Sequence, residues 1–144
     1  MKMIGYKNNI LKTNILFLNY KQIYMDEEQE WLKKAKRDFE AAKVNFREEF
    51  YDISAFLLHQ CVEKLLKAFY IKRFRKLIKT HNLVFLAEKL KIPKKFLDVC
   101  DELNPFYIEA RYPPLFVVEK YTKDNISKLI ENVGEILEWI KKEI

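Results

Sequence analysis

Only two glycines and four prolines occur in 144 residues, and this scarcity constrains the fold more than any other feature of the sequence. Strand-rich folds need many tight turns, and glycine and proline are the residues that form such turns most readily. Apolar residues make up 49% of the chain and include eleven phenylalanines, which is enough for a substantial core. The sequence therefore predicts a few long helices around one core.

Apolar residues recur at helical spacing in several segments. The predicted helices span about 27–46, 51–76, 83–90, 93–110 and 122–143. Pro105 should kink the fourth helix, and the prolines of ARYPP (residues 110–114) should end it, because proline cannot continue a helix. We expect an all-α fold, an up-down helical bundle of about five helices, in which the first, second and last pack antiparallel.

Residues 1–24 differ from the rest of the chain. They contain four lysines and no acid, and their apolar residues show no clear helical period. Met25 is followed by Asp26, Glu27 and Glu28, which suit the start of a helix because the helix dipole favours acids there. We therefore expect an N-terminal extension at 1–24, or a start codon placed too far upstream, and a helical domain at 25–144. The alternative is that residues 1–24 form a short helix or strand that packs on a partner.

Charge and composition exclude several classes of protein. The net charge is +6, and four of these charges come from the lysines of the extension, so the helical domain is nearly neutral. The basic pI thus gives little support for nucleic-acid binding. The two cysteines form no CxxC motif, and no apolar run is long enough for a signal peptide core or a membrane span. We expect a cytoplasmic protein with no metal, no cofactor and no membrane partner.

The segment FLLHQCVEKLLK, residues 56–67, combines polar residues with an apolar helical run. On a helical wheel Cys61 lies in the middle of the core half, while His59 lies on the opposite half. A His–Cys dyad and a Cys/His metal site are therefore excluded, and Cys61 and Cys100 are expected to be buried free thiols.

The half of the wheel that carries His59 also holds four residues of mixed type: Phe56, Gln60, Glu63 and Lys67. One interpretation is a solvated face with an ordinary Glu63–Lys67 pair. The other is a semi-buried polar strip that lines a groove or a dimer interface, because apolar residues among charges often mark an interface.

Five basic residues fall within eight positions at the C-terminal end of this predicted helix: Lys72, Arg73, Arg75, Lys76 and Lys79. Cations suit the C-terminal end of a helix because they complement its dipole. The alternative is a contact with phosphate or RNA. We favour the helix-terminus interpretation, since Phe74 is the only aromatic residue in the run.

The segments WLKKAKRDFEAAK, YDISAFLLHQCVEKLLKAFYI, THNLVFLAEKL and ARYP follow one another in an order and spacing that resembles the HEPN domain. The resemblance covers about residues 27–142. It implies a helical bundle, a homodimer, and pairing with a minimal nucleotidyltransferase in a toxin–antitoxin-like system. Some HEPN proteins are metal-independent ribonucleases, which use an Arg with a polar residue directly after it and a His separated from that Arg by four to six residues.

Arg75 and His81 fit the spacing of that ribonuclease motif, but the residue after Arg75 is Lys76 and not Asn, Asp or His. The resemblance also places the motif near the start of the last helices, where this sequence has EARYPP and no histidine. We therefore expect no catalytic residue. The expected function is a non-catalytic module that binds a nucleotide or a partner. Its predicted surface consists of Phe56, Gln60, Glu63, Lys67, Arg111 and Tyr112. Two alternatives stay open: a ribonuclease toxin that acts on RNA with Arg75 and His81, and a structural dimerisation module.

Overall fold

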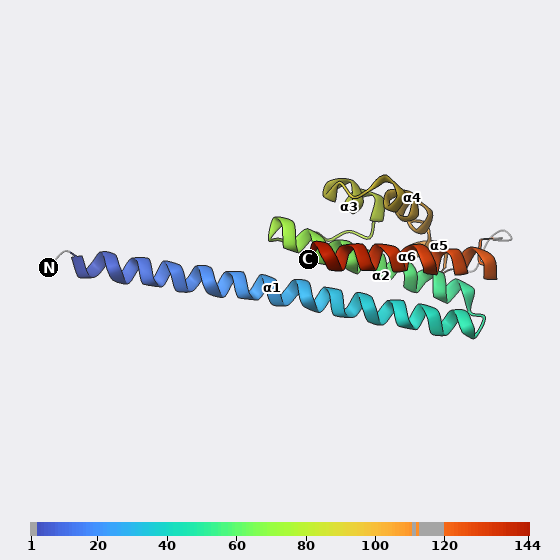
Figure 1. Cartoon of the computed structure of the whole chain (residues 1–144), viewed down its shortest axis with the longest axis horizontal. Coiled ribbons are helices and arrows are strands. Elements are labelled where there is room, and N and C mark those ends of the chain that lie inside the picture. The colour runs from blue at the N-terminus through green and yellow to red at the C-terminus, as the bar shows by residue number, and fades with distance from the viewer. Residues whose placement is uncertain (1–2, 111, 113–119) are drawn as a thin grey trace.

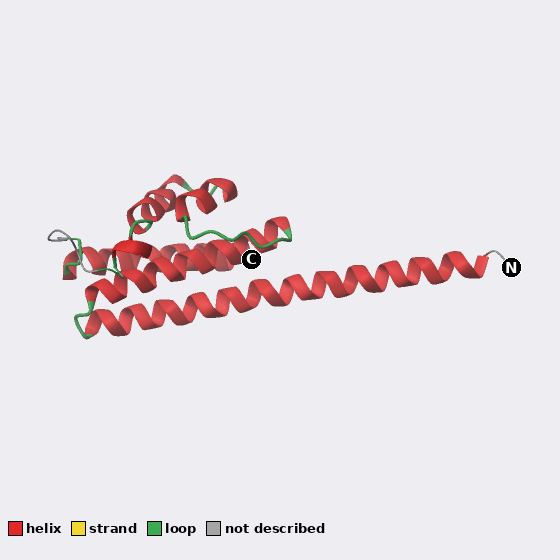
Figure 2. Ribbon diagram, turned by 180° about the vertical axis from the view of Figure 1, so that it is seen from behind, coloured by secondary structure: helices red, strands yellow, loops and turns green. Residues whose placement is uncertain are grey.

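The computed structural model describes residues 3–110, 112 and 120–144, and this part of the chain is built from helices without strands. The helices are α1 (Met3–Arg47), α2 (Tyr51–Phe74), α3 (Leu83–Leu90), α4 (Lys94–Leu103), α5 (Phe106–Glu109) and α6 (Lys123–Glu143). Figure 1 shows their arrangement, and Figure 2 shows the same bundle from behind. The all-α helical bundle predicted from the sequence is confirmed.

α2 is the central helix of the bundle. It packs against α1 along most of its length and also contacts α3, α4, α5 and α6. In both ribbon views α1 and α6 run beside α2, while α3 and α4 lie on the side away from α1. The Ser54 hydroxyl donates to the Ala42 carbonyl at 2.8 Å and joins α2 to α1 near their shared turn. Because neighbours cover α2 on more than one side, residues all around it are buried.

Local signals set the ends of the shorter helices. Asn82 caps α3 by accepting from the Phe85 amide at 3.0 Å, and Thr122 caps α6 by accepting from the Asn125 amide at 3.2 Å. Pro105 separates α4 from α5, so the predicted kink is a complete break. Arg75 ends α2 in the left-handed conformation, with φ at 56°, in a position that glycine usually takes.

The predicted start of the first helix near Glu27 is wrong, because α1 already begins at Met3. No glycine or proline lies between Gly5 and Pro93, so no residue breaks the helix where residue 24 meets the domain. The acids Asp26, Glu27 and Glu28 therefore lie inside a helix and not at its N-terminus. Residues 9–19 are exposed throughout, so this part of α1 is helical without contact to the bundle.

The expectation for the cysteines is confirmed. Cys61 and Cys100 are both free and fully buried. Burial raises the pKa of the Cys100 thiol to about 12, and it raises the pKa of Cys61 as well. Neither thiol is a reactive nucleophile at neutral pH.

None of the helices in the described part of the chain combines the length and the apolar character that a membrane span requires.

Candidate functional site

The polar strip of α2 is buried, and Glu63 lies at its centre. The Lys67 ammonium donates to Glu63 Oε1 at 2.6 Å, one helical turn further along. His81, from the segment after α2, approaches from the other side, with Nδ1 at 3.0 Å from Oε1 and 3.1 Å from Oε2. Glu63 and Lys67 are 5% and 6% exposed, so the solvated-face interpretation is wrong, while the dimer interface stays a prediction. A carboxylate only accepts hydrogen bonds, so Nδ1 of His81 carries the proton.

His59 lies one helical turn before Glu63 on α2 and is fully buried. Its Nε2 lies 3.2 Å from the His81 carbonyl oxygen, and its Nδ1 lies 3.4 Å from the Gln60 amide oxygen. Since a carbonyl oxygen only accepts, Nε2 is the donor in the contact with residue 81. His59 therefore holds the backbone of residue 81, while Glu63 holds its side chain.

Tyr107 completes the cluster from α5. Its ring stacks on His81 with centroids 4.2 Å apart and planes 13° apart, and it lies 5.5 Å from the His59 ring. Pro105 restarts the chain as a short helix, and the buried Phe106 anchors that helix in the core. Tyr107 is thereby held over His81. We call His59, Glu63, Lys67, His81 and Tyr107 the Glu63 cluster.

A cavity of about 330 Å³ opens beside the Glu63 cluster. Its lining residues, which define the Trp31 cavity, are Trp31, Lys67, Leu77, Ile78, Lys79, Thr80 and His81. The Lys67 ammonium lies 5.4 Å from the centre of the Trp31 ring, in the range of a cation–π contact. The cavity thus combines an indole, apolar side chains and several cationic or ionisable groups.

The residues predicted from the sequence are only partly brought together. Glu63 and Lys67 lie in the cluster, and Gln60 touches it through His59. Phe56 is half-buried on the same helix. Tyr112 is 63% exposed and lines a separate cavity, which also contains Tyr51 and Tyr121 near the turn between α1 and α2. Arg111 lies outside the described residues.

Arg75 and His81 engage different carboxylates. Arg75 Nη1 lies 3.9 Å from Glu28 Oε2 on α1, and Lys72 lies 3.8 Å from the other oxygen of the same buried carboxylate. His81 is held by Glu63 on α2. The prediction that Arg75 and His81 are not a catalytic pair stays a prediction, and their separate partners support it.

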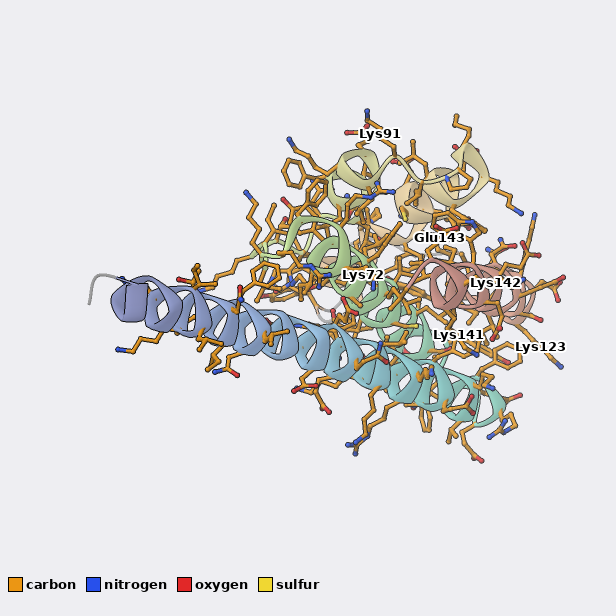
Figure 3. The ribbon with its side chains drawn as sticks, turned by 60° about the vertical axis from the view of Figure 1, so that its left-hand side comes forward. Lys72, Lys91, Lys123, Lys141, Lys142 and Glu143 are labelled. Carbon is orange, nitrogen blue, oxygen red and sulfur yellow. The ribbon has the colours of Figure 1, made fainter. Side chains whose placement is uncertain are left out.

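The basic run at the C-terminal end of α2 is largely occupied by contacts within the chain. Besides Lys72 and Arg75, Arg73 donates to the Leu90 carbonyl at 2.5 Å and lies over the Phe69 ring. Figure 3 shows Lys72 near the middle of the molecule, Lys91 at the end of α3, and Lys141 and Lys142 on α6.

Sequence reasoning missed three residues of the site. Trp31 and Tyr107 are apolar-stripe residues of their helices, and both are half-buried. Lys79 was counted only as part of a basic run. No local pattern marks these residues as a group, because they come from α1, α5 and the segment between α2 and α3.

In the described ranges, 3–110, 112 and 120–144, no group of histidine, cysteine and carboxylate side chains has the arrangement of a metal site. The cluster and the fold define an all-α bundle protein whose central helix carries a buried ionic strip. The chain matches the family model of the HEPN domain over residues 28–144, and it therefore belongs to the HEPN domain family.

Relatives of this chain agree with that assignment. This chain is 29% identical over 127 residues to the protein named "Putative toxin MJ1304" from Methanocaldococcus jannaschii. The alignment covers 77% of this chain and 84% of that protein. The crystal structure of ST0689, an archaeal HEPN homologue, superposes with a TM-score of 0.68 at 27% identity and covers 81% of this chain and 96% of that one. The structure of TT1696 from Thermus thermophilus shares the fold, with a TM-score of 0.72 at 18% identity. The match covers 81% of this chain and 98% of TT1696.

The buried His59 predicts a specific pH dependence of stability. Burial lowers the pKa of His59, and the nearby Glu63 carboxylate opposes this only in part. The unfolded chain binds a proton at this residue near pH 6.5, whereas the folded chain binds it only at lower pH. Stability should therefore fall as the pH drops below about 6.5, by at most about 1.4 kcal/mol per pH unit for one proton. Urea melts should show that the free energy of unfolding falls less between pH 7.5 and pH 5.5 for His59→Gln than for the wild type. An equal difference in both proteins would contradict this role.

Proposed function

We propose that this HEPN protein is a non-catalytic nucleotide-binding component of a toxin–antitoxin-like pair, and that the nucleotide binds in the Trp31 cavity. The observation that carries the proposal is the composition of that cavity. A nucleotide needs a flat apolar surface for its base and cations for its phosphates, and Trp31 with Leu77 and Ile78 supplies the first. Lys79, which lines the same cavity, supplies the second.

The size and accessibility of the cavity support the proposal. A volume of about 330 Å³ falls at the lower end of small-molecule sites. The His81 side chain is 53% exposed, so its ring is accessible to a ligand although Glu63 fixes its orientation. A preorganised ring loses little conformational entropy when a ligand binds.

The ionic contacts favour binding over catalysis. Lys67, the buried cation of the cavity, is neutralised by Glu63, and Arg75 is held against Glu28. Both residues therefore serve the fold of the chain. The likeness to a protein named as a toxin and the resemblance to HEPN proteins support a system in which the partner is a nucleotidyltransferase, with this chain acting as a homodimer.

Tryptophan fluorescence provides a direct test of nucleotide binding. The chain has two tryptophans, and Trp139 packs against Phe69 and Phe96 away from the cavity. In a Trp139→Phe background, AMP and ATP should quench the emission of Trp31. Lys79→Ala should weaken binding roughly tenfold, equivalent to about 1.4 kcal/mol, in both fluorescence and calorimetry.

Lys141→Ala is the matched control, because Lys141 lies on α6 and pairs with the exposed Glu138. In the Trp139→Phe background, the Lys141→Ala variant should bind nucleotide with the same affinity as the protein without that change. If millimolar AMP and ATP give neither quenching nor heat, or if the Lys79 and Lys141 variants bind equally well, the proposal fails.

One observation favours ribonuclease activity as a second candidate. Glu63 accepts from Nδ1 of His81, and a carboxylate that holds an imidazole in this way leaves the Nε2 lone pair to act as a general base. In this case the protein would cleave RNA in the presence of EDTA, and His81→Ala and Arg75→Ala would each abolish cleavage. A structural dimerisation module would show neither cleavage nor nucleotide binding.

A further inference from the structure

The N-terminal half of α1 projects from the bundle as a single helix. Figures 1 and 2 show no other element beside it, from Met3 to the point where α2 ends. At a rise of about 1.5 Å per residue, the part before residue 28 is roughly 37 Å long. The match to the HEPN family model begins only at residue 28, so this helix is additional to the family domain.

One face of the projecting helix is apolar and exposed. On a wheel of about 100° per residue, the residues on this face, which we call the N-terminal stripe, are Ile10, Leu11, Asn14, Ile15, Phe17 and Leu18. Its five apolar side chains are between 56% and 65% exposed. The opposite face carries Asn9, Lys12, Thr13 and Asn19 together with Leu16, and the Thr13 hydroxyl donates to the Asn9 carbonyl of its own helix. A helix with this distribution normally buries its apolar face against another element.

The stripe continues the face of α1 that packs in the bundle. Leu32, Ala35 and Ala42 are buried between α1 and its neighbours. On the same wheel their directions overlap those of the stripe, with the two centres roughly 60° apart. Within the bundle α2 covers this side of α1, and beyond the bundle the same side is uncovered.

We propose that a second copy of this chain covers the N-terminal stripe, with the two projecting helices packed antiparallel about a two-fold axis near Asn14. The area is sufficient: five large apolar side chains expose on the order of 500 Å² on each helix, and a pair therefore reaches roughly the 1,000 Å² that a specific interface needs. Lys12 is the one charged residue between positions 9 and 19, and it lies on the face opposite the stripe.

Asn14 explains why the partner is a second copy. It stands between Leu11 and Leu18 at spacings of three and four, the seam of a coiled coil. An amide both donates and accepts hydrogen bonds, so two Asn14 side chains can satisfy each other across a two-fold axis. A single asparagine in such a seam also fixes the register of the pair. The hydrocarbon interior of a lipid bilayer would leave this amide without a partner.

The position of the bundle determines the orientation. On the wheel, the face of α1 that packs in the bundle lies roughly 60° from the stripe, and the bundle is at the C-terminal end of the helix. In a parallel pair, both bundles would lie at the same end and crowd each other beside the paired helices. In an antiparallel pair, they lie at opposite ends, and Leu11 of each helix lies near Leu18 of the other.

Sedimentation analysis of the full chain tests the pairing with a matched pair of variants. Leu18→Lys places a charge in the stripe, whereas Leu16→Lys places the same charge on the opposite face, where Leu16 is 68% exposed. The wild type and Leu16→Lys should have the same mass at tens of micromolar, and Leu18→Lys should have half of it. The proposal fails if the wild type is already a monomer, or if both variants have the mass of the wild type. It also fails if both variants have a mass that is lower than that of the wild type by the same amount.

Disulfide cross-linking tests the orientation. The native cysteines are fully buried and do not compete. Leu11→Cys mixed with Leu18→Cys should give a covalent dimer on oxidation, while Leu11→Cys alone should give little. Efficient cross-linking of Leu11→Cys alone would show a parallel pair and overturn the antiparallel assignment. A monomer that floats with anionic lipid vesicles would instead identify a membrane surface as the occupant.

Discussion

Glu63→Gln should lower the free energy of unfolding by about 3–5 kcal/mol, the usual cost of removing one partner from a buried ion pair. The Lys67 ammonium is 6% exposed and donates to Glu63 at 2.6 Å, and the substitution leaves it buried beside a neutral amide. His81 loses an ionic acceptor at the same time, so the loop over the Trp31 cavity is held less firmly. Urea denaturation at pH 7.5 measures the effect directly.

Two further variants show whether the buried charge is the cause. Glu135→Gln should stay within about 0.5 kcal/mol of the wild type, because that carboxylate is exposed and lies 4.0 Å from Lys95. The double variant Glu63→Gln with Lys67→Met should recover most of the lost stability, since no unpaired charge is then buried. If the double variant is as unstable as the sum of its single substitutions, the loss comes from packing and not from charge.

Phe106→Ala should cost about 3–5 kcal/mol, as is typical for a phenylalanine removed from a closed core. Phe106 is 2% exposed and is the buried residue of α5, where it also packs against Tyr121. Its loss should release Tyr107 from the His81 ring, so nucleotide affinity should fall together with stability. Thermal or urea melts measure the first effect, and Trp31 fluorescence measures the second.

Ile108→Ala is the control in the same short helix, because Ile108 is 60% exposed. It should change stability by less than about 0.5 kcal/mol and should leave nucleotide binding unchanged. Equal losses in the two variants would mean that α5 contributes through its helical conformation and not through the anchoring of Phe106.

Several parts of the fold followed directly from local sequence. The helices that became α2, α3 and α6 were predicted within two residues at each end, because apolar periodicity marks them without help from the tertiary structure. Pro105 marked the break that separates α4 from α5. The start of α1 was missed, because a long exposed helix needs no apolar period and residues 1–24 contain no breaker after Gly5.

The sequence by itself determined that the chain is helical, that its two cysteines are buried and free, and that Glu63 and Lys67 share one strip of a helix. These properties depend on spacing along one segment, which a helical wheel represents fully. Only the tertiary structure decided that this strip is buried and that His81 and Tyr107 complete it. They lie 18 and 44 residues after Glu63, and the loop after α2 and the short helix α5 bring them to it. A polar residue on a helix face is solvated or buried according to what covers that face, and the elements that cover it are distant in the chain.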